Sequence, residues 1–378
     1  MTEHSHGAGA PVPVQTRSER FTSTAHADFP EVTGREVNWK YTPVAKLGDL
    51  IDGELDGSPY EIAYADAAGA TVEWLDRTHA LVGAAGIPED RAAANAWTNF
   101  EKALHIRLEG DAETLTVVRS TLGGSARAAH TIVSAAKGAT GLVVLDSQGD
   151  AKLTENVEIV LEDDANVTVV SVQQWDDSAL HLASQYARIG HGASLRHIVV
   201  SLGGDVVRVN PSAHLAEEGA EAELYGVYFA DAGQHLEQQV YVNHDAPHTR
   251  SRVTYKGALN GEGAHTVWIG DVLIGRDATG TDTYEQNRNL VLSDGTRADS
   301  IPNLEIETGD IEGAGHASAT GRFDDEQLFY LQARGIPEDE ARRLVVLGFL
   351  SEVVQKIGEP VLEARLHEAL EDELAAAR

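Results

Sequence analysis

The chain has 378 residues, 42% of them apolar and only 6% aromatic, which predicts a globular protein with an aliphatic core, in one long domain or two to three shorter ones. Sixty acidic and 29 basic residues leave a formal net charge of −31, which argues against nucleic acid or an anionic membrane as partner. The chain has no cysteine, which excludes disulfides, thiolate metal sites and a cysteine nucleophile.

Residues 1–28 are rich in Gly, Ala, Pro, Ser, Thr and His and lack periodicity, so we expect a disordered tail. His4 and His6 are metal-binding residue types, but we expect a mobile tail rather than a metal site. The tail has no apolar signal core, and no stretch approaches the roughly 20 apolar residues of a membrane span. We therefore expect a cytoplasmic protein.

Residues 29–104 predict a mixed, partly helical region. The stretch from Arg35, "REVNWKYTPVAKLGDLIDG", places Trp39 and Leu47 as apolar anchors near a short helix. Farther on, "GIPEDRAAANAWTNFEKAL" has Pro88 at the first turn of a predicted helix and an Ala-rich continuation.

Residues 105–322 predict a long succession of short strands, because apolar and polar residues alternate between Gly, Asp, Asn and Ser turns. A doubly wound parallel sheet would need crossover helices, which the pattern lacks. Two all-β architectures remain open: a sandwich or barrel of hairpins, and a β-helix of stacked coils. Few tight hairpin signals are present, which favours the β-helix. With roughly 20 to 25 residues per coil, about nine or ten coils are expected.

Residues 323–378 return to a helical period. Asp324 is a capping-type residue before the first helix, and Pro337 is expected in the first turn of the second. The second helix has a wide apolar face, which must pack on the protein's own scaffold or on a partner. This face contains Leu344, Val345, Leu347, Phe349, Leu350, Val353, Val354 and Ile357.

His316 is the first candidate for chemistry, in "GDIEGAGHASATGRF". Neutral imidazole is a competent ligand for iron, zinc or copper, and the surrounding small residues leave the side chain accessible. A lone histidine beside glycines is more often a structural or surface residue. With only Asp310 or Glu312 nearby, His316 cannot complete a metal or cluster site alone.

His244 and His248 form a second candidate, four residues apart in "VNHDAPHTRSR". That spacing places two metal ligands on one face of a helix, but Pro247 and the strand-like surroundings predict a strand and a turn. We expect these residues to fix a corner of a coil, with Asp245 and Arg250 hydrogen-bonded to the backbone.

Asp277, Asp282 and Glu285 form a third candidate. Some β-helix proteins are polysaccharide enzymes with clustered carboxylates, so these acids could act as acid and base or hold calcium. Solvated turn acids beside a ladder of Asn287 and Asn289 are the commoner reading. A β-helix carbohydrate-active enzyme is therefore the alternative function.

Four stretches in chain order resemble the SufB/SufD family of iron–sulfur cluster assembly proteins, in particular its SufD members. They are "WKYTP", "NHDAPHTRSRVTYKGAL", "YEQNRNLVLSDGTRADSIPNLEIETGDIEGAGHASATG" and "DDEQLFYLQARGIPEDEARRLVVLGF". The resemblance implies a right-handed parallel β-helix flanked by N- and C-terminal helical regions. It also implies a non-enzymatic scaffold in a complex with SufB and the SufC ATPase.

Site roles follow from the same resemblance. His316 corresponds to the family histidine implicated in building a nascent, transient cluster at the SufB interface, and the isolated chain is expected to bind no cofactor stably. The resemblance implies that the C-terminal helices dock the ATPase, and we expect Val346 and Phe349 to be exposed. The residues expected to contact the ATPase are Leu344, Val346, Leu347, Phe349 and Leu350. A homodimer of the isolated chain is possible.

One departure from the family pattern bears on the chemistry. Many relatives have Cys-Ser before the histidine, whereas this chain has Gly313, Ala314 and Gly315. Cluster irons generally take four ligands, mostly thiolates, with histidine an occasional substitute. Any sulfur ligand would therefore come from SufB.

Overall fold

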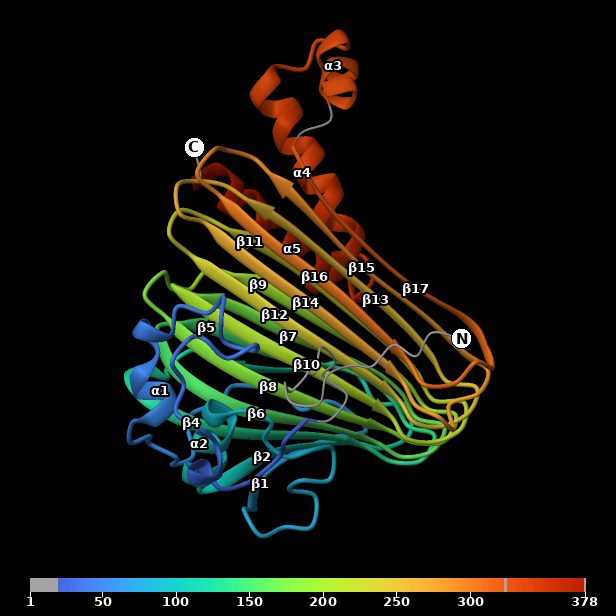
Figure 1. Cartoon of the computed structure of the whole chain (residues 1–378). Coiled ribbons are helices and arrows are strands. Elements are labelled where there is room, and N and C mark those ends of the chain that lie inside the picture. The colour runs from blue at the N-terminus through green and yellow to red at the C-terminus, as the bar shows by residue number, and fades with distance from the viewer. Residues whose placement is uncertain (1–19, 323–324, 377–378) are drawn as a thin grey trace, which may run out of the picture.

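The computed structural model describes residues 20–322 and 325–376, so His4, His6 and Asp324 lie outside the described residues. Two sheets dominate the structure (Figure 1). Sheet A contains β1 (Ala70–Asp76), β2 (Lys102–Leu108), β4 (Gly123–Ala135), β6 (Ala151–Leu161), β8 (Leu180–Ile189), β10 (Val206–Leu215), β12 (His235–His244), β14 (His265–Ile274) and β16 (Arg297–Ile306). Sheet B contains β3 (Leu115–Arg119), β5 (Thr140–Gly149), β7 (Asn166–Trp175), β9 (Ser194–Leu202), β11 (Glu221–Ala230), β13 (Arg250–Leu259), β15 (Thr281–Val291) and β17 (Ile311–Gly321).

From β2 onward, successive strands alternate between the two sheets, which makes the protein a parallel β-helix of about eight turns. The predicted fold class is confirmed, whereas the expected nine or ten coils were too many. Each turn of the helix is longer than expected because most strands have about ten residues. In-register partners Leu180 and Val206 are 26 positions apart, and His265 and Arg297 are 32 apart.

The interior is aliphatic over most of its length, because alternate residues of each strand point inward and in most strands are mainly Val, Leu, Ile and Ala. Four buried aromatic rings interrupt this pattern, and two of them pack on glycines of the neighbouring strand. Tyr228 lies beside Gly257, and Tyr255 lies beside Gly226, in register across β11 and β13. Each glycine therefore leaves the space that a ring from the next strand occupies.

The two ends of the β-helix differ. At the N-terminal end, Ala63 exchanges two backbone hydrogen bonds with Val118 of β3, and β1 pairs antiparallel with β2. Tyr60, Ile62 and Trp74 pack against the first turn of the core. At the C-terminal end, β16 and β17 terminate their sheets, and neither has a further strand among the described residues.

The N-terminal region packs on the outer face of sheet A. It contains η1 (His26–Asp28), η2 (Val44–Lys46), α1 (Gly48–Asp52) and α2 (Arg91–Asn99). The α2 helix begins after Asp90, whose side chain accepts a hydrogen bond from the Ala93 amide, so Pro88 precedes the helix rather than lying in its first turn.

Residues 20–28 were predicted to belong to a disordered tail, and this is wrong for the described part. Arg20 forms ion pairs with Glu89 and Asp271, and its guanidinium lies 3.7 Å from the Tyr241 ring centroid. The Ser23 amide donates to the Pro88 carbonyl at 3.1 Å. The low hydrophobicity of residues 20–28 predicts disorder, but polar contacts rather than apolar packing hold this segment.

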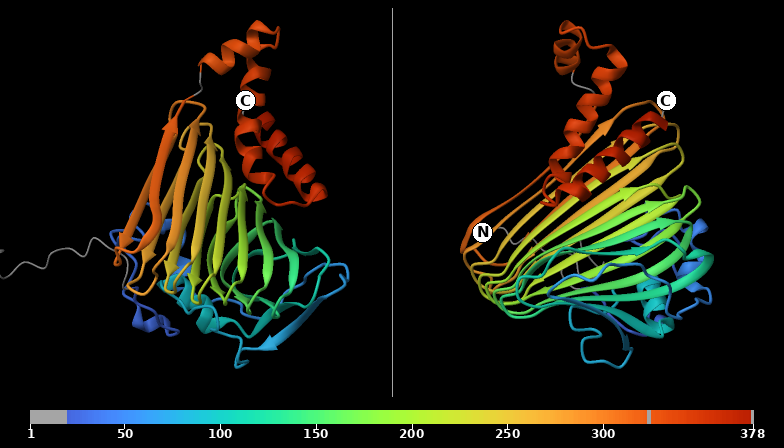
Figure 2. Two further views of the ribbon diagram at one scale, coloured as in Figure 1. Left: turned by 90° about the vertical axis from the view of Figure 1, so that its right-hand side faces the viewer. Right: turned by 180° about the vertical axis from the view of Figure 1, so that it is seen from behind.

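The C-terminal region contains α3 (Asp325–Ala333), α4 (Glu338–Val354) and α5 (Pro360–Ala376). Figure 2 shows α4 and α5 lying along the outer face of sheet B, while α3 projects beyond the β-helix. The apolar face of α4 packs on Val200 and Phe229, and two ion pairs, Lys256–Glu352 and Arg365–Asp146, join the helices to the sheet. Pro337 is the N-cap of α4.

The expected exposure of Val346 is wrong, because its side chain is 1% exposed and packs against the protein's own sheet. Leu347 and Leu350 are buried there as well, and Phe349 is partly buried. Of the five residues expected to dock the ATPase, Leu344 is the one exposed large side chain, at 39%. Among the described residues, no helix is both long enough and apolar enough to span a membrane.

Candidate functional site

His316 lies on β17, at the open C-terminal end of the β-helix. Its in-register partner on β15 is Glu285, and in-register residues of parallel strands point to the same side of the sheet. Glu285 points into the interior, so His316 also faces the interior. Its side chain is nevertheless 45% exposed, because no further turn covers it among the described residues.

The local sequence sets this orientation. A register shift between Thr281 and Asp282 admits one extra residue into β17, so that Ala314 and His316 face inward. Gly313, before Ala314, and Gly315, between Ala314 and His316, face outward. A Cβ on Gly315 would lie 3.2 Å from the Tyr284 ring, so a small residue suits this position.

Glu285 is the unusual neighbour of His316. Its side chain is 1% exposed, and neither carboxylate oxygen forms a hydrogen bond of ordinary length and angle with the described residues. Burial, together with the charge of Asp271, raises the pKa of Glu285 to about 8, and the backbone amide of Asn303 opposes this only in part. Oε1 of Glu285 lies 3.8 Å from Nδ1 of His316.

The inward face of β15 is polar throughout, unlike the earlier strands. It presents Thr281, Thr283, Glu285, Asn287 and Asn289, all buried. Most of these groups are bonded: Asn287 donates to the Tyr228 hydroxyl at 2.8 Å, and Thr283 lies 2.6 Å from the Ser251 hydroxyl. The interior therefore becomes hydrophilic just below His316.

His244 and His248 do not form a joint site. His244 is buried, with Nδ1 2.8 Å from Thr249 Oγ1 and Nε2 2.9 Å from Ser251 Oγ, and burial lowers its pKa to about 3. His248 lies in the following turn with a φ of +56°.

The corner beside these histidines is held differently from the expectation for Asp245 and Arg250. The Asp245 side chain contacts His214, and the Arg250 side chain forms ion pairs with Glu221 and Asp282, rather than the expected hydrogen bonds to the backbone.

Asp277, Asp282 and Glu285 do not converge on a groove. Asp282 faces outward and pairs with Arg252, whereas Glu285 faces inward on the same strand. Asp277 precedes β15 in a turn. The described residues contain no group of three or more His, Asp or Glu side chains placed to hold a metal ion. His316 and Glu285 are only two such side chains and do not make a complete metal site by themselves.

Sequence reasoning singled out both members of this pair but for different functions. The motif indicates His316, whereas Glu285 is a sequence candidate only as an enzyme acid or calcium ligand together with Asp277 and Asp282. The alternating polar residues of "TDTYEQNRN" indicate an inward polar row on one strand. They do not indicate which residue 31 positions later lies beside it.

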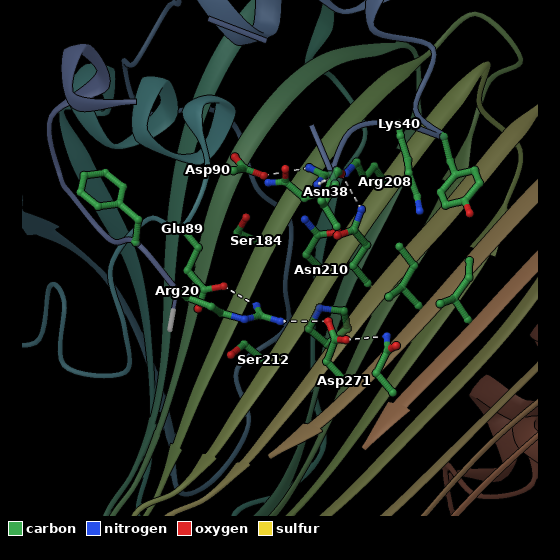
Figure 3. Close-up of a pocket in the computed structure, with 18 of the residues that line it drawn as sticks. Arg20, Asn38, Lys40, Glu89, Asp90, Ser184, Arg208, Asn210, Ser212 and Asp271 are labelled. Carbon is green, nitrogen blue, oxygen red and sulfur yellow. Dashed lines mark hydrogen bonds and ion pairs between the residues drawn. The ribbon is translucent and has the colours of Figure 1, made fainter. Parts of the chain in front are cut away.

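A pocket of about 610 Å³ lies elsewhere, between the N-terminal region and the outer face of sheet A. Figure 3 shows its charged groups joined to one another: Arg20 lies between Glu89 and Asp271, and Arg208 bonds Asp90. Arg208 also stacks 4.0 Å from the Trp39 ring centroid. These polar groups fasten the N-terminal region to the sheet.

Comparisons of the sequence with known proteins identify a family. The model of the SufBD core domain of the SUF system for iron–sulfur cluster assembly matches residues 118–349, from within β3 into α4. An iron–sulfur cluster assembly SufBD family protein of Mycobacterium tuberculosis is 46% identical over 369 residues, covering 95% of this chain and 93% of that protein. A Mycobacterium leprae member is also 46% identical, with 90% of each chain covered.

A second, longer M. leprae member of the same family is more distant. It is 30% identical over 201 residues, which are 53% of this chain and 23% of that protein. The matched core contains the polar turns of the β-helix, His316 and Glu285, so the resemblance seen in the sequence motifs is confirmed at the level of the family. The chain belongs to the SufBD family of iron–sulfur cluster assembly proteins.

Proposed function

We propose that this chain is a SufD-type subunit: a non-enzymatic, cytoplasmic scaffold that pairs with SufB and binds the SufC ATPase. The observation that carries the proposal is the position of His316, which faces inward at the uncovered end of the β-helix. There the imidazole can meet a second protein while its own strand holds it in place.

The absence of cysteine supports an asymmetric pairing. A nascent cluster is cargo that needs mostly thiolate ligands, and this chain supplies none. We infer that SufB contributes the sulfur ligands and that His316 contributes one nitrogen. The cluster is then transient, and the isolated chain holds none stably.

The open end also supports a partner at this surface. The terminal strands β16 and β17 present backbone groups that no other described strand pairs, and such edges in natural proteins are usually covered. The inward residues Ala314, His316, Ser318 and Thr320 are exposed there. A homologous β-helix end would cover them, and a second copy of this chain would do so when SufB is absent.

A His316→Ala variant is expected to assemble with SufB and SufC normally and to lower the cluster yield at least about tenfold, because a metal ligand is lost. Iron and sulfide are measured on the purified complex. The matched control is His214→Ala, a half-exposed histidine on β10 with a 38% exposed side chain. A normal cluster yield from the His316 variant would refute its assigned role.

For the ATPase, α3 offers a better docking surface than α4. Phe329 is 71% exposed and Tyr330 58% exposed, on a helix that projects beyond the β-helix (Figure 1). Exposed aromatic side chains of this kind are typical anchors of protein interfaces. Together with Leu344 they form the docking surface that we propose for SufC.

A Phe329→Glu variant is expected to weaken SufC binding at least about tenfold. Replacing an aromatic anchor of an interface with a charged residue removes on the order of 1–2 kcal/mol or more of binding free energy. Affinity is measured by calorimetry with the full chain. Val361→Glu is the matched control, since Val361 is 77% exposed on α5, outside this surface. Equal affinities of the two variants would count against docking on α3.

A further inference from the structure

The burial of the Glu285 side chain is not explained by the proposed scaffold role. Its side chain is 1% exposed and accepts no hydrogen bond of ordinary length and angle from the described residues, although the backbone amide of Asn303 acts on it weakly. Buried side-chain oxygens without a well-formed hydrogen bond are rare in native proteins, and a bound ion is one of the explanations for such a group. The structure supplies no arginine or lysine ion pair to this group among the described residues.

The surroundings of Glu285 are shaped to hold it. A Cβ on Gly270, across the interior on β14, would lie 2.3 Å from Oε2, so the carboxylate fills space that this glycine leaves. Two further buried groups at this end also lack partners among the described residues: Trp268 Nε1 and Ser300 Oγ. These two residues are in register on β14 and β16, at the same open end.

The distance to His316 fits a shared ion better than a hydrogen bond. At 3.8 Å, Oε1 and Nδ1 are too far apart for direct bonding. Divalent transition metals bind histidine nitrogen at about 2.0–2.1 Å and carboxylate oxygen at about 2.0–2.2 Å, so one ion can reach both atoms. Because His316 is half-exposed, an ion can enter from the open end.

We propose that Glu285 and His316 together bind a divalent transition-metal ion, with Glu285 as an oxygen ligand inside the β-helix and His316 as a nitrogen ligand at its mouth. Mixed imidazole and carboxylate ligands suit iron and its neighbours in the first row. The remaining positions are left for water or for groups of a partner chain. The inference rests on the proposed function in one respect, that the ion is the iron destined for the cluster.

The test uses Co²⁺ as a spectroscopic probe with the full, metal-free chain. The buffer contains 0.15 M salt, which screens charges on the protein surface beyond roughly 8 Å, and excess Mg²⁺, which occupies surface carboxylates. One saturable Co²⁺ site is expected, and Glu285→Gln and His316→Ala should each weaken it at least about tenfold. Glu312→Gln, an exposed acid on the same strand, is the matched control and should change binding less than about twofold.

Glutamine has the shape of glutamate and no charge, so the Glu285→Gln variant is expected to fold, and its melting temperature without metal checks this. Co²⁺ should then raise the melting temperature of the wild type but not of either variant. Equal Co²⁺ binding by the wild type and Glu285→Gln would overturn the inference, as would the absence of a saturable site. A loss of cluster yield in His316→Ala would still support the scaffold role in that case.

Discussion

A Gly257→Ala variant is expected to lose at least about 2 kcal/mol of unfolding free energy, because inserting a methyl group into a filled core forces its neighbours out of place. The added Cβ would lie 1.8 Å from an atom of the Tyr228 ring. The Tyr228 side chain is 1% exposed, and its hydroxyl forms hydrogen bonds with both Asn287 and Asn289. The ring therefore cannot shift without breaking these contacts. Chemical denaturation of the full chain measures the loss.

The control for this substitution is Gly348→Ala in α4, where no atom lies within 4 Å of the added Cβ. There alanine should stabilise the helix by up to about 1 kcal/mol. Gly226→Ala, whose Cβ would meet the Tyr255 ring at 2.0 Å, should repeat the loss independently. Similar stabilities for Gly257→Ala and Gly348→Ala would show that the tyrosine rings are free to move.

A Glu155→Gln variant is expected to lose roughly 3–5 kcal/mol, because it leaves a buried guanidinium without its counter-charge. Arg119 donates to Glu155 at 2.6 Å, and their side chains are 8% and 1% exposed. His181 bonds the same carboxylate at 2.8 Å. Calorimetric or denaturant unfolding at neutral pH measures the difference.

Glu109→Gln is the matched control, since Glu109 also pairs with an arginine, Arg107, but is 65% exposed. Exposed pairs contribute at most about 1 kcal/mol, so this variant should be nearly as stable as the wild type. Replacing Arg119 with Met in the Glu155→Gln background should recover part of the loss, because no charge is then stranded. Equal losses from both single variants would contradict the buried-pair explanation.

The stability difference between the wild type and Glu155→Gln is expected to depend on pH. Burial alone would raise the pKa of Glu155, but the charge and hydrogen bonds of Arg119, with the bond to His181, outweigh it and hold the pKa well below its ordinary value of 4.5. A lowered carboxyl pKa contributes stability above the unfolded value, and the contribution is lost as the pH falls. The gap between wild type and Glu155→Gln should therefore narrow below pH 4.5.

Much of the fold could be predicted because a β-helix depends on local alternation. Residues such as Val167, Val169 and Leu195 occupy every second position and fill the interior. The size of the coils could not be read in the same way, since the alternation does not show how many residues each turn of chain contains. Nor does the apolar face of α4 reveal that sheet B, rather than a partner, covers Val346.

The site was predictable in parts. His316 stands out within its motif, but its neighbour Glu285 is 31 positions away, and register across parallel strands is a property of the whole stack. The extra residue at the start of β17 shifts that register by one, which decides whether His316 faces the interior or the solvent. Such a shift leaves no signal in composition or in local alternation.

The unequal ends of the β-helix limit how the molecule can polymerise. A stack of parallel strands exposed at both ends would add copies without limit, as fibrils do. Here the segment around Ala63 pairs with β3 and β1 pairs antiparallel with β2, so one end has no parallel strand at its edge, whereas the parallel strands β16 and β17 are unpaired on their outer sides among the described residues. Association through one end stops at two molecules, so growth into filaments is avoided.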